Sequence, residues 1–299
     1  MEEIINGKEE CPNAIFHKQS GKRILITGAG GFLASRLIKY YSGNYDIIGL
    51  NHKELDFTDY EKARECFEKF HPNIAIHCGA ISDVGACDIN PEYSYQVNVH
   101  GAENIARACA EYGTKLIFCS SDQVYFGSSE KKPHKESEIL TPPHAYGKQK
   151  LEAEKRCMEC NANTVALRLS WMYDWKKESE NEHGNLMTTI AEAIKTGQVM
   201  KYPVHDYRSI TNVWEVIKNL EKAFLIPSGI YNFGSPNECN TYELVKCVLE
   251  QMKKDVNLVV ENTEAFTDNP RNLRMDQEKI NGQSIVFLDT LKGIKATIE

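Results

Sequence analysis

A short apolar run that leads straight into a glycine-rich turn constrains the fold of this chain more than any other feature. Residues 23–27 read Arg-Ile-Leu-Ile-Thr, residues 28–31 read Gly-Ala-Gly-Gly, and a helical pattern covers residues 32–41. The β-branched run is typical of a strand buried on both faces. Gly28 allows a tight turn, Gly31 lets the backbone approach a pyrophosphate, and the helix N-terminus offers unpaired N–H groups to an anion. This placement favours a dinucleotide-binding turn over a purely structural one.

Strand and helix patterns alternate beyond this turn. Strand patterns occupy residues 46–50, 73–78, 115–119 and 165–169, and helical patterns occupy residues 59–70, 91–112 and 145–160. Such alternation predicts an α/β fold of the Rossmann type. In that fold a doubly wound parallel sheet binds its ligands at the carboxyl ends of the strands.

The alternation loosens in the second half of the chain, where helical patterns recur at residues 186–196, 213–224 and 241–252. We expect residues 22–170 to form an NAD(P)-binding Rossmann domain. Residues 171–299 would form mainly a smaller C-terminal substrate-binding lobe, with some segments returning to the Rossmann domain. Residues 1–21 show no sustained period and are interpreted as an N-terminal arm.

Composition narrows the class of protein. The chain has 299 residues, of which 41% are hydrophobic and 26% charged, as in a soluble globular protein. A formal charge of −7 without a basic cluster argues against nucleic-acid binding. No apolar stretch suits a bilayer, and no signal peptide precedes the ten cysteines, so we expect a cytoplasmic protein with reduced thiols. Cys157 and Cys160 form a CxxC without further ligands, so no metal site is predicted.

The second predicted strand ends without the acidic residue that would hold a ribose 2′-hydroxyl. Asn51, His52 and Lys53 stand there instead. These side chains would not repel a 2′-phosphate, so the sequence modestly favours NADP while NAD remains open. His52 is read equally well as a solvated loop residue.

A tyrosine and a lysine lie one helical turn apart, at Tyr146 and Lys150. A free phenol has a pKa of about 10, which a neighbouring ammonium would lower, so Tyr146 is a candidate general acid or base. This spacing often occurs by chance. Ser121 strengthens it, because that hydroxyl follows the strand predicted at residues 115–119 and faces the same crevice.

Together these residues resemble the extended short-chain dehydrogenase/reductase superfamily, and finer motifs resemble its dTDP-4-dehydrorhamnose reductase branch. The motifs are Leu55-Asp56-Phe57-Thr58-Asp59, His77-Cys78-Gly79-Ala80-Ile81-Ser82, Ser120-Ser121-Asp122-Gln123-Val124-Tyr125, Leu167-Arg168-Leu169-Ser170-Trp171-Met172-Tyr173 and Asn269-Pro270-Arg271-Asn272. The resemblance runs from Arg23 almost to the C-terminus.

The resemblance implies a set of site residues. Those implied for the cofactor are Gly28, Gly30, Gly31, Phe32, Leu33, Asn51, His52, Asp56, Phe57, Cys78, Gly79, Ala80, Asn98, Tyr146 and Lys150. Those implied for the substrate are Ser82, Val84, Ser121, Asp122, Trp171 and Arg271. Asn98 is read about equally well as a plain helix-surface residue, and Arg271 as a surface charge.

The family pattern is not complete. Gly79 replaces a more usual alanine, and Asn269 stands where the branch has an arginine, which leaves Arg271 two places on. The region of Thr211 keeps only part of the pattern, and residues 174–184 are unlike it. Most of these departures fall where the substrate is chosen.

The implied activity is NAD(P)H-dependent reduction of a nucleotide-linked 4-keto-6-deoxy sugar. Tyr146 would protonate the forming alkoxide, Ser121 would orient the carbonyl, and Lys150 would tune Tyr146 and hold the cofactor ribose. Two alternatives stay open. One is a nucleotide-sugar epimerase or dehydratase, and the other is a non-catalytic partner like the regulatory subunit of methionine adenosyltransferase. The nucleotide sugar is the expected partner, and a homodimer remains open.

Overall fold

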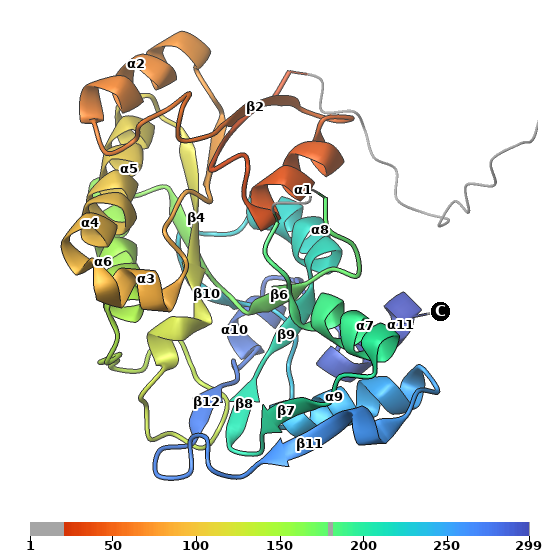
Figure 1. The fold of residues 1–299 in the computed structure, drawn as a ribbon. Coiled ribbons are helices and arrows are strands. Elements are labelled where there is room, and N and C mark those ends of the chain that lie inside the picture. Colours follow the sequence, from red (N-terminus) through yellow and green to blue (C-terminus); the bar gives the residue numbers. More distant parts are fainter. Residues whose placement is uncertain (1–20, 179–181, 299) are drawn as a thin grey trace, which may run out of the picture.

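The centre of the molecule is a parallel sheet of six strands. The computed structural model describes residues 21–178 and 182–298, so nearly all of the predicted N-terminal arm lies outside the described residues. The strands lie in the order β10-β5-β4-β3-β1-β2 (Figure 1). Their bounds are Arg23–Thr27 for β1, Asp46–Leu50 for β2, Ile74–His77 for β3, Lys115–Ser121 for β4, Thr164–Leu169 for β5 and Gly229–Phe233 for β10. The predicted Rossmann-type fold is confirmed.

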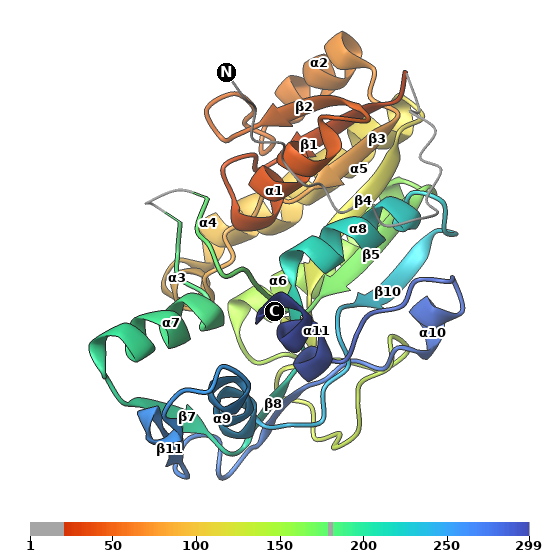
Figure 2. The same ribbon diagram turned by 90° about the vertical axis from the view of Figure 1, so that its right-hand side faces the viewer.

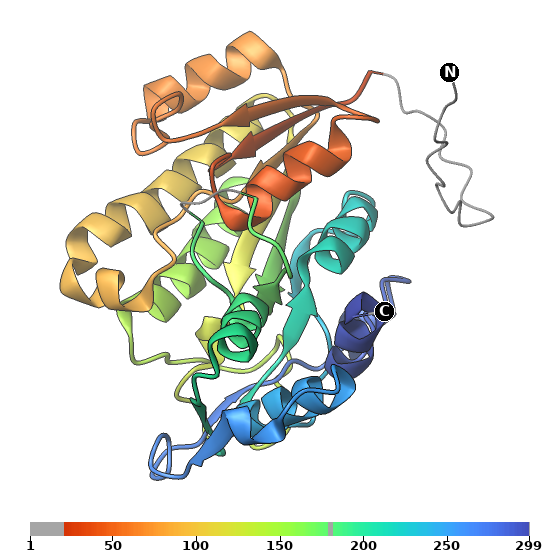
Figure 3. The same ribbon diagram turned by 45° about the vertical axis from the view of Figure 1, so that its right-hand side comes forward.

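Helices cover both faces of this sheet (Figures 2 and 3). Helices α1 (Phe32–Tyr41) and α8 (Val213–Ala223) pack on one face, and α2 (Tyr60–Phe70), α5 (Gly101–Glu111) and α6 (Ala145–Cys160) pack on the other. Both faces are therefore buried, which explains why β1 and β3 are continuous apolar runs. The predicted bounds of the helices at residues 32–41 and 145–160 are confirmed.

The long helix predicted at residues 91–112 is interrupted. It consists of α4 (Pro91–Tyr95), a π-helical turn (Gln96–His100) and α5. A further short helix, α3 (Val84–Ile89), precedes it and was not predicted, because six residues carry too little periodicity. Asp83 and Asn90 cap α3 and α4 with their side chains, which fixes the boundary between the two helices.

A second lobe lies beyond the carboxyl ends of the strands. It contains three parallel two-stranded pairs, namely β6 (Trp171–Tyr173) with β9 (Ile210–Asn212), β7 (Met200–Pro203) with β11 (Val259–Asn262), and β8 (Asp206–Arg208) with β12 (Arg271–Leu273). Its helices are α7 (Leu186–Thr196), α9 (Thr241–Gln251) and α11 (Thr290–Ile298), which share one apolar core.

Short helical segments complete the described chain. They are the 3₁₀ turns η2 (Asp122–Tyr125) and η3 (Val256–Leu258), and helix α10 (Glu278–Asn281). Within the described ranges no helix combines the length and the apolar character needed to cross a bilayer.

Candidate active site

The glycine turn connects β1 to α1 with a tight backbone. Gly28 has φ +70°, in the left-handed region that glycine adopts without strain. A Cβ atom at Gly28 would lie 2.9 Å from the backbone of Gly79, so no larger residue fits. Gly31 donates its N–H to the carbonyl of Gly28 at 2.8 Å, and a Cβ at Gly30 would meet nothing within 4 Å. The turn is thus packed closely against Gly79 at Gly28, whereas the space next to Gly30 is open.

Helix α1 begins without a side-chain cap. Its N-cap residue is Gly31, no side chain among the described residues accepts from its first N–H groups, and its first turn holds no acidic residue. Helix α2, by contrast, starts at Asp59, whose carboxylate accepts two backbone N–H groups. Phe32 and Leu33 therefore open a helix whose uncapped end suits an anion. These residues fit the pyrophosphate of a dinucleotide.

The end of β2 lies next to this turn, because Ala29 donates its N–H to the carbonyl of Leu50 at 3.1 Å. Asn51 there accepts the N–H of Lys53 through its side chain. His52 and Lys53 are both exposed, and the Glu54 carboxylate is bound to the N–H of Asn51. The predicted cofactor-selecting residues therefore do lie beside the glycine turn.

Asp56 and Phe57, predicted near the cofactor, have different surroundings. Asp56 is exposed, and the hydroxyl and N–H of Thr58 bind its carboxylate and hold its pKa below the usual value. Phe57 is 8% exposed and packs edge-to-face on His77. A Cβ at Gly79 would come within 2.5 Å of the Phe57 ring, which explains why glycine replaces the family's alanine there.

The segment after β3 is held by Asn98. Cys78 and Ala80 are half-buried, and the Cys78 sulfur lies 3.6 Å from the sulfur of Cys119. Asn98 is 1% exposed, so the reading of a plain helix-surface residue is wrong. Its amide bonds both the N–H and the carbonyl of Ile81, and its Nδ2 also donates to Gln149 at 2.9 Å. Asn98 therefore joins this segment to the helix that carries Tyr146.

Ser121, Tyr146 and Lys150 meet at the carboxyl edge of the sheet. Tyr146 is 7% exposed, and the half-buried Ser121 lies near enough to lower the pKa of its phenol. Lys150 is 4% exposed, donates to the carbonyl of Cys119 at 2.9 Å and lies 5.8 Å from the centre of the Tyr146 ring. The three side chains that the sequence predicted as catalytic are thus brought together.

Burial sets the charge states of these groups. Desolvation raises the pKa of Tyr146 well above its ordinary value, and the neighbouring Ser121 hydroxyl offsets part of that rise. Desolvation lowers the pKa of Lys150. A phenol with a raised pKa is protonated at neutral pH, so Tyr146 can donate a proton to a forming alkoxide.

Two residues set the position of helix α6, which carries Tyr146 and Lys150. His144 caps it by accepting the N–H of Gly147 through Nδ1 at 2.9 Å. The Asp88 carboxylate, from α3, accepts the N–H of Ala145 at 2.8 Å. Sequence reasoning did not single out either residue, although a polar side chain two positions before the tyrosine is a recognisable capping signal.

The second lobe places an arginine, Arg208, over the predicted substrate residues. Its guanidinium stacks 4.2 Å from the centre of the Trp171 ring and lies 4.0 Å from the Asp122 carboxylate. Within the described part of the chain, Arg208 Nε and Asp122 Oδ2 are buried and have no hydrogen-bond partner. Desolvation raises the pKa of Asp122, although Arg208 opposes the rise. Sequence reasoning missed Arg208, because only the pairing of β8 with β12 brings it here.

The remaining predicted substrate residues are spread more widely. Arg271 is half-buried, and both its Nε and Nη2 bind the carboxylate of Asp206, at 2.7 and 2.6 Å. It is thus the half-buried ion-pair partner of a buried carboxylate rather than a plain surface charge. Ser82 is exposed and Val84 half-buried, at the start of α3. In the part of the chain that the structure describes, neither Ser82 nor Val84 forms a hydrogen bond with Tyr146.

A charged network beneath the site is structural. Glu154 on α6 is 1% exposed and binds Arg168 of β5 at 2.8 Å. Arg168 donates to the Tyr125 hydroxyl, which in turn donates to Asn232 of β10. Among residues 21–178 and 182–298, no group of three or more His, Cys, Asp or Glu side chains could hold a metal ion.

Known proteins share this architecture. The chain is 27% identical to dTDP-4-dehydrorhamnose reductase of Aggregatibacter actinomycetemcomitans over 93% of this chain and 99% of that protein. It is 28% identical to methionine adenosyltransferase 2 subunit beta of Xenopus tropicalis, over 84% of this chain and 77% of that protein.

Solved structures show the same fold. A dTDP-4-dehydrorhamnose reductase of Bacillus anthracis in complex with NADP has a TM-score of 0.82, at 23% identity over 92% of this chain and 96% of that one. UDP-glucose 4-epimerase of Thermus thermophilus complexed with NAD has a TM-score of 0.76, at 21% identity over 92% and 97%.

The family assignment covers almost the whole described chain. Residues 22–297 match the RmlD substrate binding domain. That match includes the glycine turn, the Ser121, Tyr146 and Lys150 group, and the second lobe. The predicted resemblance is confirmed, and the chain belongs to the RmlD substrate binding domain family.

Proposed function

We propose that this protein is an NAD(P)H-dependent reductase of a nucleotide-linked 4-keto-6-deoxy sugar. The observation that carries the proposal is the grouping of buried Tyr146 and Lys150 with half-buried Ser121 at the carboxyl edge of the sheet, the same edge that carries the glycine turn. The dTDP-4-dehydrorhamnose reductase relative supports this substrate class, since it matches over nearly the whole of both chains.

Each of the three side chains has a separate role in the proposed reduction. When bound, a reduced nicotinamide dinucleotide supplies a hydride to the keto carbon. Tyr146 gives its phenolic proton to the oxygen that becomes the alcohol, because its raised pKa keeps that proton in place at neutral pH. Ser121 donates a hydrogen bond to the same oxygen and orients the carbonyl. Lys150, whose Nζ lies 4.9 Å from the centre of the Phe118 ring and 5.8 Å from that of Tyr146, stabilises the phenolate that forms.

The second lobe provides the contacts for the rest of the substrate. Arg208 is a planar cation whose Nε has no hydrogen-bond partner among the described residues, and it suits an anionic oxygen of a nucleoside diphosphate. Trp171 holds that guanidinium on its face and offers an apolar wall to the sugar. Arg271 stays engaged with Asp206, so its role is to place Asp206 and β8 rather than to bind the substrate directly.

The end of β2 selects the cofactor. His52 and Lys53 are exposed beside the glycine turn, and Asn51 replaces the acidic residue that would exclude a 2′-phosphate. NADP is therefore the favoured cofactor, with NAD as the alternative. The residues implied to contact it are those of the glycine turn together with Cys78, Ala80 and Lys150.

The test is oxidation of NADPH and of NADH by the purified protein with a 4-keto-6-deoxy nucleotide sugar. Tyr146→Phe removes the proton donor, and we expect kcat to fall by about 10²- to 10⁴-fold while cofactor affinity changes little. Tyr93→Phe is the matched control, because Tyr93 is 61% exposed on α4. Equal turnover by wild type and Tyr146→Phe would refute the assigned role.

A non-catalytic partner subunit is the second candidate, favoured by the match to methionine adenosyltransferase 2 subunit beta over 84% of this chain. In that case the protein would bind the cofactor without turnover of any keto sugar and would co-purify with a synthetase.

An epimerase would retain its cofactor through purification and interconvert sugars without net NADPH oxidation. Size-exclusion chromatography with light scattering would establish whether the protein forms a homodimer.

A further inference from the structure

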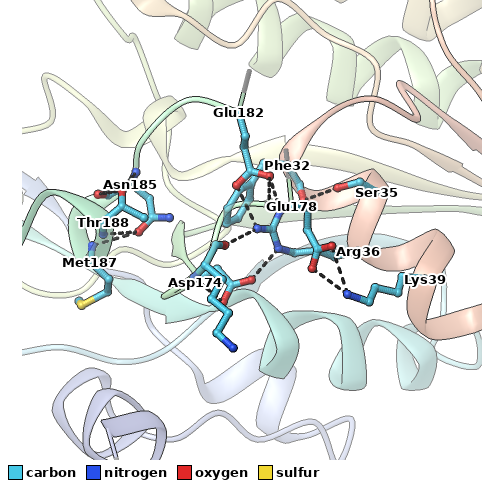
Figure 4. Close-up of polar contacts among 11 residues, drawn as sticks. Phe32, Ser35, Arg36, Lys39, Asp174, Glu178, Glu182, Asn185, Met187 and Thr188 are labelled. Carbon is cyan, nitrogen blue, oxygen red and sulfur yellow. Dashed lines mark hydrogen bonds and ion pairs between the residues drawn. The ribbon is translucent and has the colours of Figure 1, made fainter. Parts of the chain in front are cut away.

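Arg36, in the second turn of α1, is a fully buried cation outside the catalytic group. Its side chain is 0% exposed, and its three nitrogens make five hydrogen bonds (Figure 4). Nε donates to Asp174 at 2.7 Å, Nη1 to Glu182 at 3.0 Å and to the Phe32 carbonyl at 2.9 Å, and Nη2 to Glu182 and to the Lys176 carbonyl, both at 2.9 Å. A guanidinium has five N–H donors, so the site uses all of them.

Three of these partners come from the segment between β6 and α7. Asp174 follows β6 directly, and Glu182 precedes the capping box of Asn185 and Thr188 that starts α7. This is the stretch that departs most from the family pattern. Arg36 therefore ties the connection between the sheet and the second lobe to the helix that follows the glycine turn.

The remaining contacts of Arg36 are with Phe32, which directly follows the glycine turn. Its guanidinium carbon lies 4.1 Å from the centre of the Phe32 ring, and Nη1 binds the carbonyl of the same residue. Phe32 is the first residue of α1 and follows Gly31. The Phe32 ring is half-buried, so one part of it contacts Arg36 and another remains accessible. Arg36 thus fixes the residue that borders the uncapped helix end.

A structural role alone does not account for the composition of this cluster. Two buried carboxylates oppose a single guanidinium, at a place where an apolar contact would serve packing as well. A nearby exposed pair, Lys39 with Glu178, already links α1 to the same segment. What Arg36 adds is a hydrogen bond from Nη1 to the Phe32 carbonyl and a stack on the Phe32 ring, and its bidentate pair with Glu182 keeps the guanidinium in that position.

We propose that Arg36 is a positioning residue for the cofactor. It acts through Phe32 and holds the phosphate-binding turn in its binding geometry, so that the cofactor dissociates slowly. Asp174 and Glu182 complete the arrangement by fixing the guanidinium over the Phe32 ring. The inference rests on the proposed binding of a nicotinamide dinucleotide at the glycine turn.

The experiment compares NADPH binding by wild type, Arg36→Met and Glu182→Gln. Equilibrium fluorescence titration gives Kd, and displacement of bound NADPH in a stopped-flow instrument gives the dissociation rate. We expect Arg36→Met to raise Kd at least tenfold through faster dissociation, and Glu182→Gln to act in the same direction with a smaller effect. Lys39→Met is the matched control on α1, and its Kd should stay within twofold of wild type.

A double-mutant cycle with Phe32→Leu tests whether Arg36 acts through Phe32. If it does, the effects of Arg36→Met and Phe32→Leu on the dissociation rate will be clearly less than multiplicative in the double variant. If Arg36→Met does not fold, the same cycle is measured with Glu182→Gln.

The outcomes separate this inference from the proposed function. Lower thermal stability with unchanged Kd and dissociation rate would make Arg36 a purely structural residue and overturn the inference. Independent effects of Arg36 and Phe32 would overturn it as well. Failure of wild type to bind either dinucleotide would instead refute the proposed function.

Discussion

His77 is a buried imidazole whose surroundings disfavour a charge. It is 1% exposed, its Nδ1 lies 2.7 Å from the Thr27 hydroxyl, and its ring stacks on Phe118. Desolvation, with a smaller effect of Lys150, lowers its pKa from 6.5 to about 3. The unfolded chain therefore binds a proton between these two pH values that the native state does not bind. The contribution of neutral His77 to the free energy of unfolding is therefore present in full above pH 6.5. It is lost as the pH falls toward 3.

We predict that His77→Asn weakens this acid dependence. Below the pKa that the histidine has in the unfolded chain, one such buried histidine lowers the free energy of unfolding by up to about 1.4 kcal/mol for each pH unit. Urea unfolding at pH 7.5 and at pH 5.5 measures how far the free energy of unfolding falls between these two pH values. This fall should be about 1 kcal/mol smaller in the variant than in wild type. The exposed His71→Asn serves as the control. The same loss in wild type and His77→Asn would contradict the prediction.

Single residues of the site were predictable where spacing along one element carried the signal. Tyr146 and Lys150 share one helix, and Gly28 and Gly31 share one turn. Arg208 was not predictable, because its position depends on a pairing between β8 and β12, more than sixty residues apart in sequence. The contacts of Arg36 depend likewise on a segment about 140 residues further along the chain.

At the scale of elements, helix α6 joins the sheet through a buried ion pair. Glu154 and Arg168 are 1% and 2% exposed in their side chains. Removal of one partner leaves an uncompensated buried charge, so Glu154→Gln should lower the free energy of unfolding by about 3–5 kcal/mol. Glu152→Gln, which breaks the more exposed pair with Arg156 on the same helix, should cost about 0.5 kcal/mol or less. Urea unfolding of both variants at pH 7.5 checks this, and comparable losses would show that burial is not the cause.

The ends of a helix or strand were predictable where the element is long and its apolar residues recur with a clear period. Helices α1, α6 and α7 start and end where the periodicity predicted, since ten or more residues define a face. The strands of the second lobe have three or four residues each and carry no usable alternation. The positions of β7, β9 and β11 follow from packing against α9 and α11 rather than from local pattern.

At the scale of the whole molecule, the chain returns from the second lobe to finish the sheet. Helix α8 and strand β10 follow lobe segments in sequence, yet α8 packs on α1 and β10 pairs with β5. The expected division at residue 170 therefore separates parts that share one core. We predict that a fragment of residues 22–170 does not fold alone, because it would expose the apolar face that Val213, Val216, Ile217 and Leu220 cover. Cooperative thermal unfolding of this fragment by circular dichroism would contradict the prediction.

The π-helical turn at Gln96–His100 makes the molecule sensitive to the length of this helix as well as to its side chains. One extra residue is accommodated there between α4 and α5. Deleting a single residue from the turn would restore regular helical hydrogen bonding and would shift the residues of the turn itself, Asn98 among them, relative to their neighbours. The bonds of Asn98 to Ile81 and Gln149 would then be lost together. Shortening the chain here by one codon would therefore be more damaging than most substitutions at the same positions.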